Sequence, residues 1–89
     1  SYEYRPVPAE KKIVLSYESN YSGPGEIRPL IPWAFWGTAD KEAGRKLLEV
    51  RRDGALCPFR QLSRNQDDFI VVDTDFAKHT LEIKLKDNG

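Results

Sequence analysis

The segment over residues 26–37 constrains the fold more than any other part of this sequence. It reads Glu-Ile-Arg-Pro-Leu-Ile-Pro-Trp-Ala-Phe-Trp-Gly and contains both tryptophans of the chain. Pro29 and Pro32 remove two backbone N–H donors, so this segment cannot be a central strand of a sheet. Its side chains are nevertheless strongly apolar. We therefore expect the segment to cross one end of the hydrophobic core or to lie at the edge of a sheet.

The size of the chain predicts one small domain over residues 1–89, with a core that has little margin. Fourteen Lys and Arg residues balance fourteen Asp and Glu residues, so the formal net charge is zero. Proteins that coat nucleic acid usually have a basic excess, and we expect no nucleic-acid partner. No apolar run approaches the roughly 20 residues of a membrane helix, and we expect no membrane association.

The single cysteine, Cys57, restricts the chemistry further. One thiol cannot form an internal disulfide and cannot build a Cys-rich zinc site. The cysteine usage favours a reducing, cytoplasmic location. Cys57 and His79 are the only pair that could form a thiolate–imidazole couple for nucleophilic catalysis. Cys57 lies in an apolar run beside Pro58, which favours a small core residue, and His79 is expected to be a solvated loop residue.

Two stretches in the second half have patterns typical of strands. Residues 68–73 are almost continuously apolar between two aspartates, which predicts a central strand. Residues 80–86 alternate, with Leu81, Ile83 and Leu85 on the buried face. We expect these two strands to form an antiparallel hairpin, and we expect a polar loop over residues 61–66.

The pattern near the N-terminus is open to two interpretations. Ile13, Leu15 and Tyr17 alternate as in a strand, whereas Ala9, Ile13 and Tyr17 recur at helical spacing. The β-branched and aromatic side chains slightly favour a strand over residues 13–18. Residues 9–19 could therefore be helix or strand.

The clearest helical pattern covers residues 39–52. Thr38 is placed as an N-cap, acidic residues lie in the first turn and basic residues in the last, and Gly54 is placed to end the helix. Leu47 and Val50 belong to its apolar stripe. The fold class that we predict is α+β: a small, mostly antiparallel sheet with this one main helix packed on it.

The neutral charge separates into two opposed blocks. Residues 37–64 carry seven basic and four acidic residues, and residues 65–89 carry three basic and six acidic residues. Two interpretations stay open: the blocks pair within the fold, or the acidic block faces a basic partner. The acidic block contains four aspartates that could ligate a metal, but they lack the spacing of a calcium loop, and we predict no metal site.

The order of motifs from Pro32 to Asp73 suggests a family. An aromatic Pro-Trp-Ala-Phe-Trp segment is followed by the expected helix, by Leu56-Cys57-Pro58-Phe59, by a polar gap and by Asp-Asp-Phe-Ile-Val-Val-Asp at 67–73. This order resembles the later part of the SUKH superfamily, in which a Leu-x-Pro-Phe step precedes a polar turn and a strand that ends in Asp. The resemblance implies an α+β fold and a small bacterial immunity protein that neutralises a toxin, often a nuclease.

The resemblance and the acidic block together predict a binding protein that occludes a toxin, without enzymatic activity and without a cofactor. Its acidic side chains would mimic phosphates and meet the basic cleft of a nuclease, and a tryptophan would anchor the contact. The expected partner-binding residues are Asp67, Asp68, Asp73, Asp75, Trp33 and Trp36. The alternative is a structural or assembly module that forms homo-oligomers through the segment over residues 26–37, which contains the tryptophans and two prolines.

Overall fold

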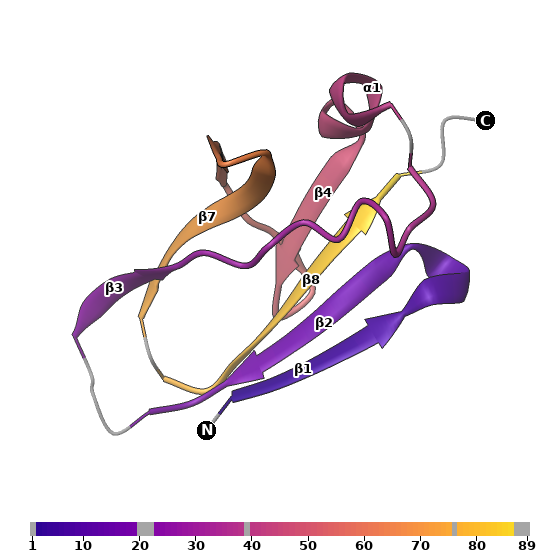
Figure 1. The fold of residues 1–89 in the computed structure, drawn as a ribbon. Coiled ribbons are helices and arrows are strands. Elements are labelled where there is room, and N and C mark those ends of the chain that lie inside the picture. Colours follow the sequence, from indigo (N-terminus) through magenta and orange to yellow (C-terminus); the bar gives the residue numbers. More distant parts are fainter. Residues whose placement is uncertain (1, 20–22, 39, 76, 87–89) are drawn as a thin grey trace.

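The computed structural model describes residues 2–19, 23–38, 40–75 and 77–86 (Figure 1). In chain order the elements are β1 (Tyr2–Val7), the 3-10 turn η1 (Pro8–Glu10), β2 (Lys12–Tyr17), β3 (Pro24–Ile27), α1 (Lys41–Arg45), β4 (Leu48–Arg52), β5 (Ala55–Leu56), β6 (Arg60–Arg64), β7 (Asp67–Asp75) and β8 (His79–Leu85).

These strands form two sheets. The larger sheet has the order β1-β2-β8-β4-β5 and the smaller has the order β3-β7-β6. Every pair of neighbouring strands is antiparallel. The prediction of an α+β fold with mostly antiparallel sheet is confirmed. The preference for a strand near residues 13–18 is also confirmed, since β2 occupies that place, between β1 and β8.

The prediction of a helix over residues 39–52 is wrong beyond its first turns. Helix α1 has five residues, and its N-cap is Asp40, whose side chain accepts the Ala43 N–H at 3.1 Å, rather than Thr38. From Leu48 the chain is a strand, because Leu48 and Val50 alternate toward the core and pair with β8. A two-residue spacing of apolar side chains was present within the helical stripe, and pairing with β8 favours the strand.

Two tight turns explain further differences from expectation. Asp53 and Gly54 both have positive φ, 51° and 86°, and join β4 to β5. Such two-residue Asp-Gly turns match the twist of a hairpin, so Gly54 belongs to a turn between strands and ends no helix. Asn65 and Gln66, with φ of 51° and 70°, join β6 to β7 in the same way. Residues 61–66 are therefore mostly strand and turn, and the predicted polar loop is wrong.

The predicted hairpin of the last two strands is wrong as well. β7 is the central strand of the smaller sheet, as its apolar sequence predicted, but β8 is the central strand of the larger one. Each strand has an inward row of apolar side chains that needs cover, and packing the two sheets face to face covers both rows. Ile70 and Val72 of β7 share one buried cluster with Leu81 and Ile83 of β8.

The segment over residues 26–37, called the Pro/Trp segment from here on, covers one end of this core, as expected for a segment that cannot be a central strand. It runs from β3 past both sheets to α1 (Figure 1). Residues 33–37 form a turn, in which the Trp36 N–H donates to the Pro32 carbonyl at 3.0 Å. Because the chain turns here, Trp33 and Trp36 are both buried and Phe35 is exposed. In an extended chain, Trp33 and Phe35 would instead lie on the same face.

Helix α1 is packed against Trp33 at Gly44. A Cβ at Gly44 would lie 2.6 Å from Cζ3 of Trp33. Alanine normally stabilises a helix relative to glycine, by about 0.5–1 kcal/mol. For Gly44→Ala we expect the opposite sign, a loss of about 1–3 kcal/mol in the free energy of unfolding, because the methyl group overlaps the indole ring. Urea unfolding measures this loss, with Glu42→Ala as the control on the exposed face, and a variant as stable as the parent contradicts it.

Candidate functional site

A buried carboxylate organises one end of the molecule. Asp68 is the first inward-facing residue of β7 and only 3% of its surface is exposed. The Trp33 indole Nε1–H donates to Oδ2 at 2.7 Å, and Nη2 of Arg45 donates to both carboxylate oxygens at 3.1 and 2.9 Å. The Ser63 hydroxyl, opposite Asp68 on β6, donates to Oδ1. The donors come from the Pro/Trp segment, from α1 and from β6, so Asp68 joins three elements to β7.

The electrostatics of Asp68 are consistent with a structural anion. Burial acts to raise the pKa of this carboxyl, but the hydrogen bonds from Ser63, Trp33 and Arg45 and the positive charge of Arg45 outweigh it and hold the pKa below 3.8. All of these donors favour the charged form. Asp68 is thus ionised and enclosed by its partners at neutral pH.

Three of the residues predicted to contact a partner are therefore inside the fold. Asp68 is surrounded by its donors, and the indole rings of Trp33 and Trp36 pack edge to face with centroids 6.1 Å apart. Both tryptophans belong to the main core cluster. Their burial corrects the prediction that they offer a contact surface, because only 5% of the Trp33 surface and 3% of the Trp36 surface are exposed.

A groove lies directly outside this buried network. It has a volume of about 370 Å³ and runs between the Pro/Trp segment and the β6–β7 turn. Leu30 and Phe35 are large hydrophobic residues of its lining that are about half exposed, at 48% and 47%. The remaining lining residues are Ile31, Pro32, Trp33, Ala34, Lys41, Gln66, Asp67 and Asp68.

Asp67 supplies the groove with an available negative charge. Its side chain is exposed and makes no hydrogen bond or ion pair in the part of the chain that the structure describes. Lys41, on the same groove, donates to the Gln66 carbonyl at 3.2 Å. The groove can therefore hold an apolar side chain between Leu30 and Phe35 and a basic group beside Asp67.

The other two predicted acidic residues lie elsewhere and already have partners. Asp73 accepts a hydrogen bond from Arg60 at 3.1 Å, and the same guanidinium donates to Glu26 at 3.1 Å. Asp75 accepts from His79 at 2.7 Å. Arg45–Asp68 and Arg60–Asp73 both join the basic block to the acidic block. For Asp68 and Asp73, the interpretation in which the charge blocks pair within the fold is confirmed.

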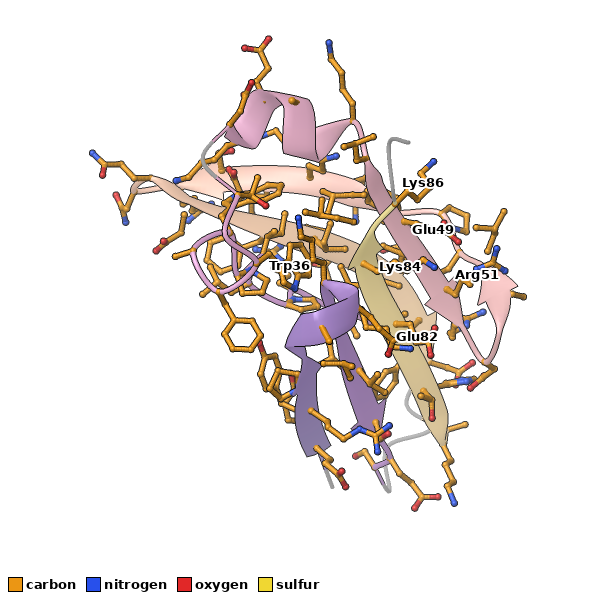
Figure 2. All side chains as sticks on the ribbon, turned by 90° about the vertical axis from the view of Figure 1, so that its right-hand side faces the viewer. Trp36, Glu49, Arg51, Glu82, Lys84 and Lys86 are labelled. Carbon is orange, nitrogen blue, oxygen red and sulfur yellow. The ribbon has the colours of Figure 1, made fainter. Side chains whose placement is uncertain are left out.

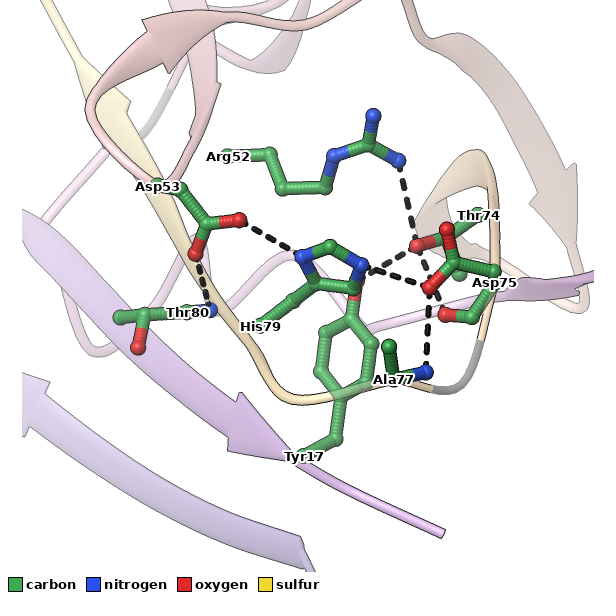
Figure 3. A network of polar contacts seen from close by, with 8 residues as sticks. All are labelled: Tyr17, Arg52, Asp53, Thr74, Asp75, Ala77, His79 and Thr80. Carbon is green, nitrogen blue, oxygen red and sulfur yellow. Dashed lines mark hydrogen bonds and ion pairs between the residues drawn. The ribbon is translucent and has the colours of Figure 1, made fainter. Parts of the chain in front are cut away.

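A second polar network, missed by the sequence interpretation, is centred on His79 (Figure 3). Nδ1 contacts Asp53 at 2.6 Å and Nε2 contacts Asp75 at 2.7 Å, on opposite sides of the ring. Asp53 follows β4 and Asp75 ends β7, so the imidazole bridges the two sheets. His79 is at the start of β8 with 16% of its side chain exposed, and it is not the solvated loop residue that was expected.

The neighbours of His79 extend this network. The Tyr17 ring lies 5.8 Å from the imidazole, and its hydroxyl is 2.8 Å from the Thr74 hydroxyl. Arg52 donates to the same Thr74 oxygen at 3.2 Å (Figure 3). Thr74 is the last inward-facing residue of β7, and the row that begins at Asp68 therefore has a bonded polar residue at each end.

The bonds to two carboxylates raise the pKa of His79 above 6.5, Asp53 contributing first and Asp75 second. Hydrogen bonds from the Thr80 N–H and then from His79 lower the pKa of Asp53, and hydrogen bonds from His79 and then from the Ala77 N–H lower that of Asp75. Only imidazolium has two N–H donors, so the arrangement favours the charged ring. His79, Asp53 and Asp75 together link the two sheets, and we call this group the His79 clamp.

The carboxylates around His79 and the thiol of Cys57 are the candidates for metal binding and for nucleophilic catalysis in the described part of the chain. In the described ranges, no group of three or more His, Cys, Asp or Glu side chains is placed to hold a metal ion. Asp53 and Asp75 lie on opposite nitrogens of His79 and cannot converge on one ion. Cys57 is partly exposed, and its thiol lies 3.5 Å from the Pro58 carbonyl. His79, with both nitrogens on carboxylates, has no free nitrogen to act as a base.

Comparisons with known proteins add no relatives. The chain matches no protein-family model, no curated protein and no solved structure. The resemblance to the SUKH superfamily therefore stays a prediction. None of the helices in the described part of the chain is long and apolar enough to span a membrane.

The clamp at His79 predicts a pH dependence of stability. A raised histidine pKa contributes stability that is complete below the unfolded pKa of about 6.5 and is lost as pH rises through the folded value. The lowered pKa values of Asp53 and Asp75 contribute stability above about 3.8, which is lost as pH falls through their folded values. The clamp is therefore strongest at mildly acidic pH.

We expect His79→Gln to lower the free energy of unfolding most near pH 5 and progressively less as the pH rises above about 6.5. Chemical unfolding of the parent and the variant across this range measures the difference, and Lys78→Gln is the control for loss of a neighbouring cation. A difference between parent and His79→Gln that is constant, or that grows toward alkaline pH, contradicts the clamp.

Proposed function

We propose that this chain is a protein-binding domain whose contact surface is the groove of Leu30, Phe35 and Asp67. The observation that carries the proposal is the pair of half-exposed hydrophobic side chains beside an unpaired carboxylate. Large hydrophobic side chains that remain exposed around a groove are typical of contact sites, and aromatic anchors dominate binding energies. The buried network beneath the groove positions it before a partner arrives, which reduces the entropy lost on binding.

The more specific form of the proposal is an immunity protein that occludes a bacterial toxin. The resemblance of the motif order to the SUKH superfamily supports it, together with the exposed carboxylate of Asp67 in the groove. A basic side chain of a nuclease toxin would lie against Asp67, and an apolar neighbour would enter between Leu30 and Phe35. Asp73 and Asp75 lie toward the other end of β7 and already bind Arg60 and His79, so this contact does not include them.

The groove has a larger neighbour that supports the proposal less well. A hollow of about 540 Å³ lies between η1, α1 and the end of β8, and Lys11 and Lys86 line it with Leu47 and Leu85. None of the five large hydrophobic residues that are exposed in the described part of the chain borders it, whereas two of them border the groove. A contact surface centred on the groove is therefore the better supported choice.

The test is binding to the toxin domain encoded beside this chain's gene, measured by titration calorimetry. We expect a 1:1 complex, which Phe35→Ser and Asp67→Lys each weaken by about tenfold or more. Leu56→Ser is the matched control for Phe35→Ser, because Leu56 is an exposed hydrophobic residue on β5 outside the groove. Glu42→Lys is the control for the charge reversal.

Two outcomes would overturn the proposal. If the groove variants bind the toxin domain as tightly as the parent, the contact lies elsewhere. If no adjacent toxin domain binds, the immunity function is wrong. Growth rescue of cells that express the toxin, measured for the same four variants, must follow the same order as the affinities.

A further inference from the structure

The first strand of the larger sheet has an open edge. β1 is the outermost strand, and Tyr2 and Tyr4 are large hydrophobic residues with 61% and 47% of their surfaces exposed. All six residues of β1 pair with β2, and no other strand in the described part of the chain lies along the opposite side of β1. An edge strand with unpaired backbone groups is a template for another strand, and proteins usually shorten or cover such edges.

The hydrogen bonds of β2 show which backbone groups of β1 face outward. The Leu85 N–H donates to the Lys11 carbonyl at 3.1 Å, so residue 11 and the odd-numbered residues after it turn toward β8. Lys12, Val14 and Ser16 then turn toward β1, where their register partners are Val7, Arg5 and Glu3. The backbone groups of Tyr2, Tyr4 and Pro6 are left facing the open edge.

The side chains of β1 are complementary to a second copy of the same strand. When two copies pair antiparallel about Tyr4, Glu3 of each copy lies opposite Arg5 of the other. Tyr2 of each lies opposite Pro6 of the other, and the two Tyr4 residues meet at the centre. Opposite charges on directly opposed positions stabilise antiparallel pairs, and aromatic pairs do so as well.

We propose that β1 pairs with β1 of a second copy of this chain, antiparallel and centred on Tyr4, to form a closed symmetric dimer. Each Tyr4 N–H donates to the Tyr4 carbonyl of the other copy, and each Tyr2 N–H donates to the Pro6 carbonyl of the other copy. Pro6 has no N–H, so the ladder ends there. A two-fold pairing uses the same edge on both copies and closes without growing into fibres.

The other edge strands are less suited to this pairing. β5 has only two residues. An antiparallel pairing of β6 with itself about Leu62 would place Arg60 opposite Arg64, and like charges in opposed positions are destabilising. β3 begins with Pro24 and has four residues. The self-complementary charge pattern of β1 therefore selects the second copy as the occupant of its edge. This surface is separate from the groove, whose lining contains no residue of β1.

The charges of β1 provide the decisive experiment, by sedimentation equilibrium at increasing concentration. The parent is expected to form dimers. Glu3→Arg gives each strand two bases and Arg5→Glu gives each strand two acids, so either variant alone is expected to dimerise about tenfold more weakly. Mixed together, the two variants are expected to form a heterodimer at least as tight as the parent dimer, because each acid again meets a base.

The backbone provides an independent variant. The Tyr4 N–H faces the open edge and takes no part in the β1–β2 ladder, so Tyr4→Pro is expected to leave the fold intact and to abolish dimerisation. Far-UV circular dichroism confirms the fold of each variant, and Glu42→Arg is the control for added charge. A parent that stays monomeric at all concentrations overturns the proposal. So does a dimer that Tyr4→Pro leaves unchanged, or a mixture of the charge variants that does not pair.

Discussion

The buried carboxylate of Asp68 is the interaction on which the rest of the structure depends. It accepts hydrogen bonds from Trp33, Arg45 and Ser63, which lie on the Pro/Trp segment, α1 and β6. Its own carbonyl accepts the Ile31 N–H at 2.8 Å. Leaving the buried indole N–H of Trp33 without an acceptor would cost free energy, about 1–3 kcal/mol. One side chain thus secures a proline-rich segment that cannot join a sheet as a full strand.

The exposed groove follows from the same constraint. When Trp33 is bound to Asp68 and Ile31 to the backbone of β7, the turn directs Ile31, Trp33 and Trp36 into the core. Leu30 and Phe35 are then left on the outside, beside Asp67. The surface that we propose for a partner is therefore the outer side of the contact that closes the core. At the opposite end of β7, His79 joins the two sheets through Asp53 and Asp75, and the inward row of β7 has polar anchors at both ends (Figure 3).

The outer face of the larger sheet shows how the remaining charges are accommodated (Figure 2). Arg51 binds Glu49 at 2.6 Å and lies opposite Glu82 in the register of β4 and β8. Lys84 lies opposite Glu49 on the same pair of strands. Acidic and basic side chains thus lie opposite one another on neighbouring strands. The fourteen acidic and fourteen basic residues give a net charge of zero, and these residues of the outer face are paired within the fold.

The sequence predicted the strands with clear patterns better than their connections. The apolar run at 68–73 and the alternation at Leu81 and Ile83 depend on local side-chain spacing, and both were confirmed. The helix predicted over 39–52 had good caps and charges, and only its pairing with β8, about thirty residues later in the chain, made residues 48–52 a strand. The Asp-Gly sequence at 53–54 is typical of a hairpin turn, but the helical interpretation took Gly54 as the residue that ends the helix. Burial of Asp68 and the clamp at His79 depend on contacts between distant segments, which spacing along the chain does not reveal.

The two indole N–H groups offer the most direct measurement of the central role of Asp68. Trp33 Nε1 donates to Asp68, whereas Trp36 Nε1 is buried and has no partner among the described residues. In ¹H–¹⁵N spectra, the account predicts that both indole protons exchange slowly with solvent. It also predicts that Asp68→Asn shifts the Trp33 resonance and accelerates its exchange far more than that of Trp36. A Trp33 indole that exchanges in the parent as fast as a free indole, or that is unaffected by Asp68→Asn, would contradict the account.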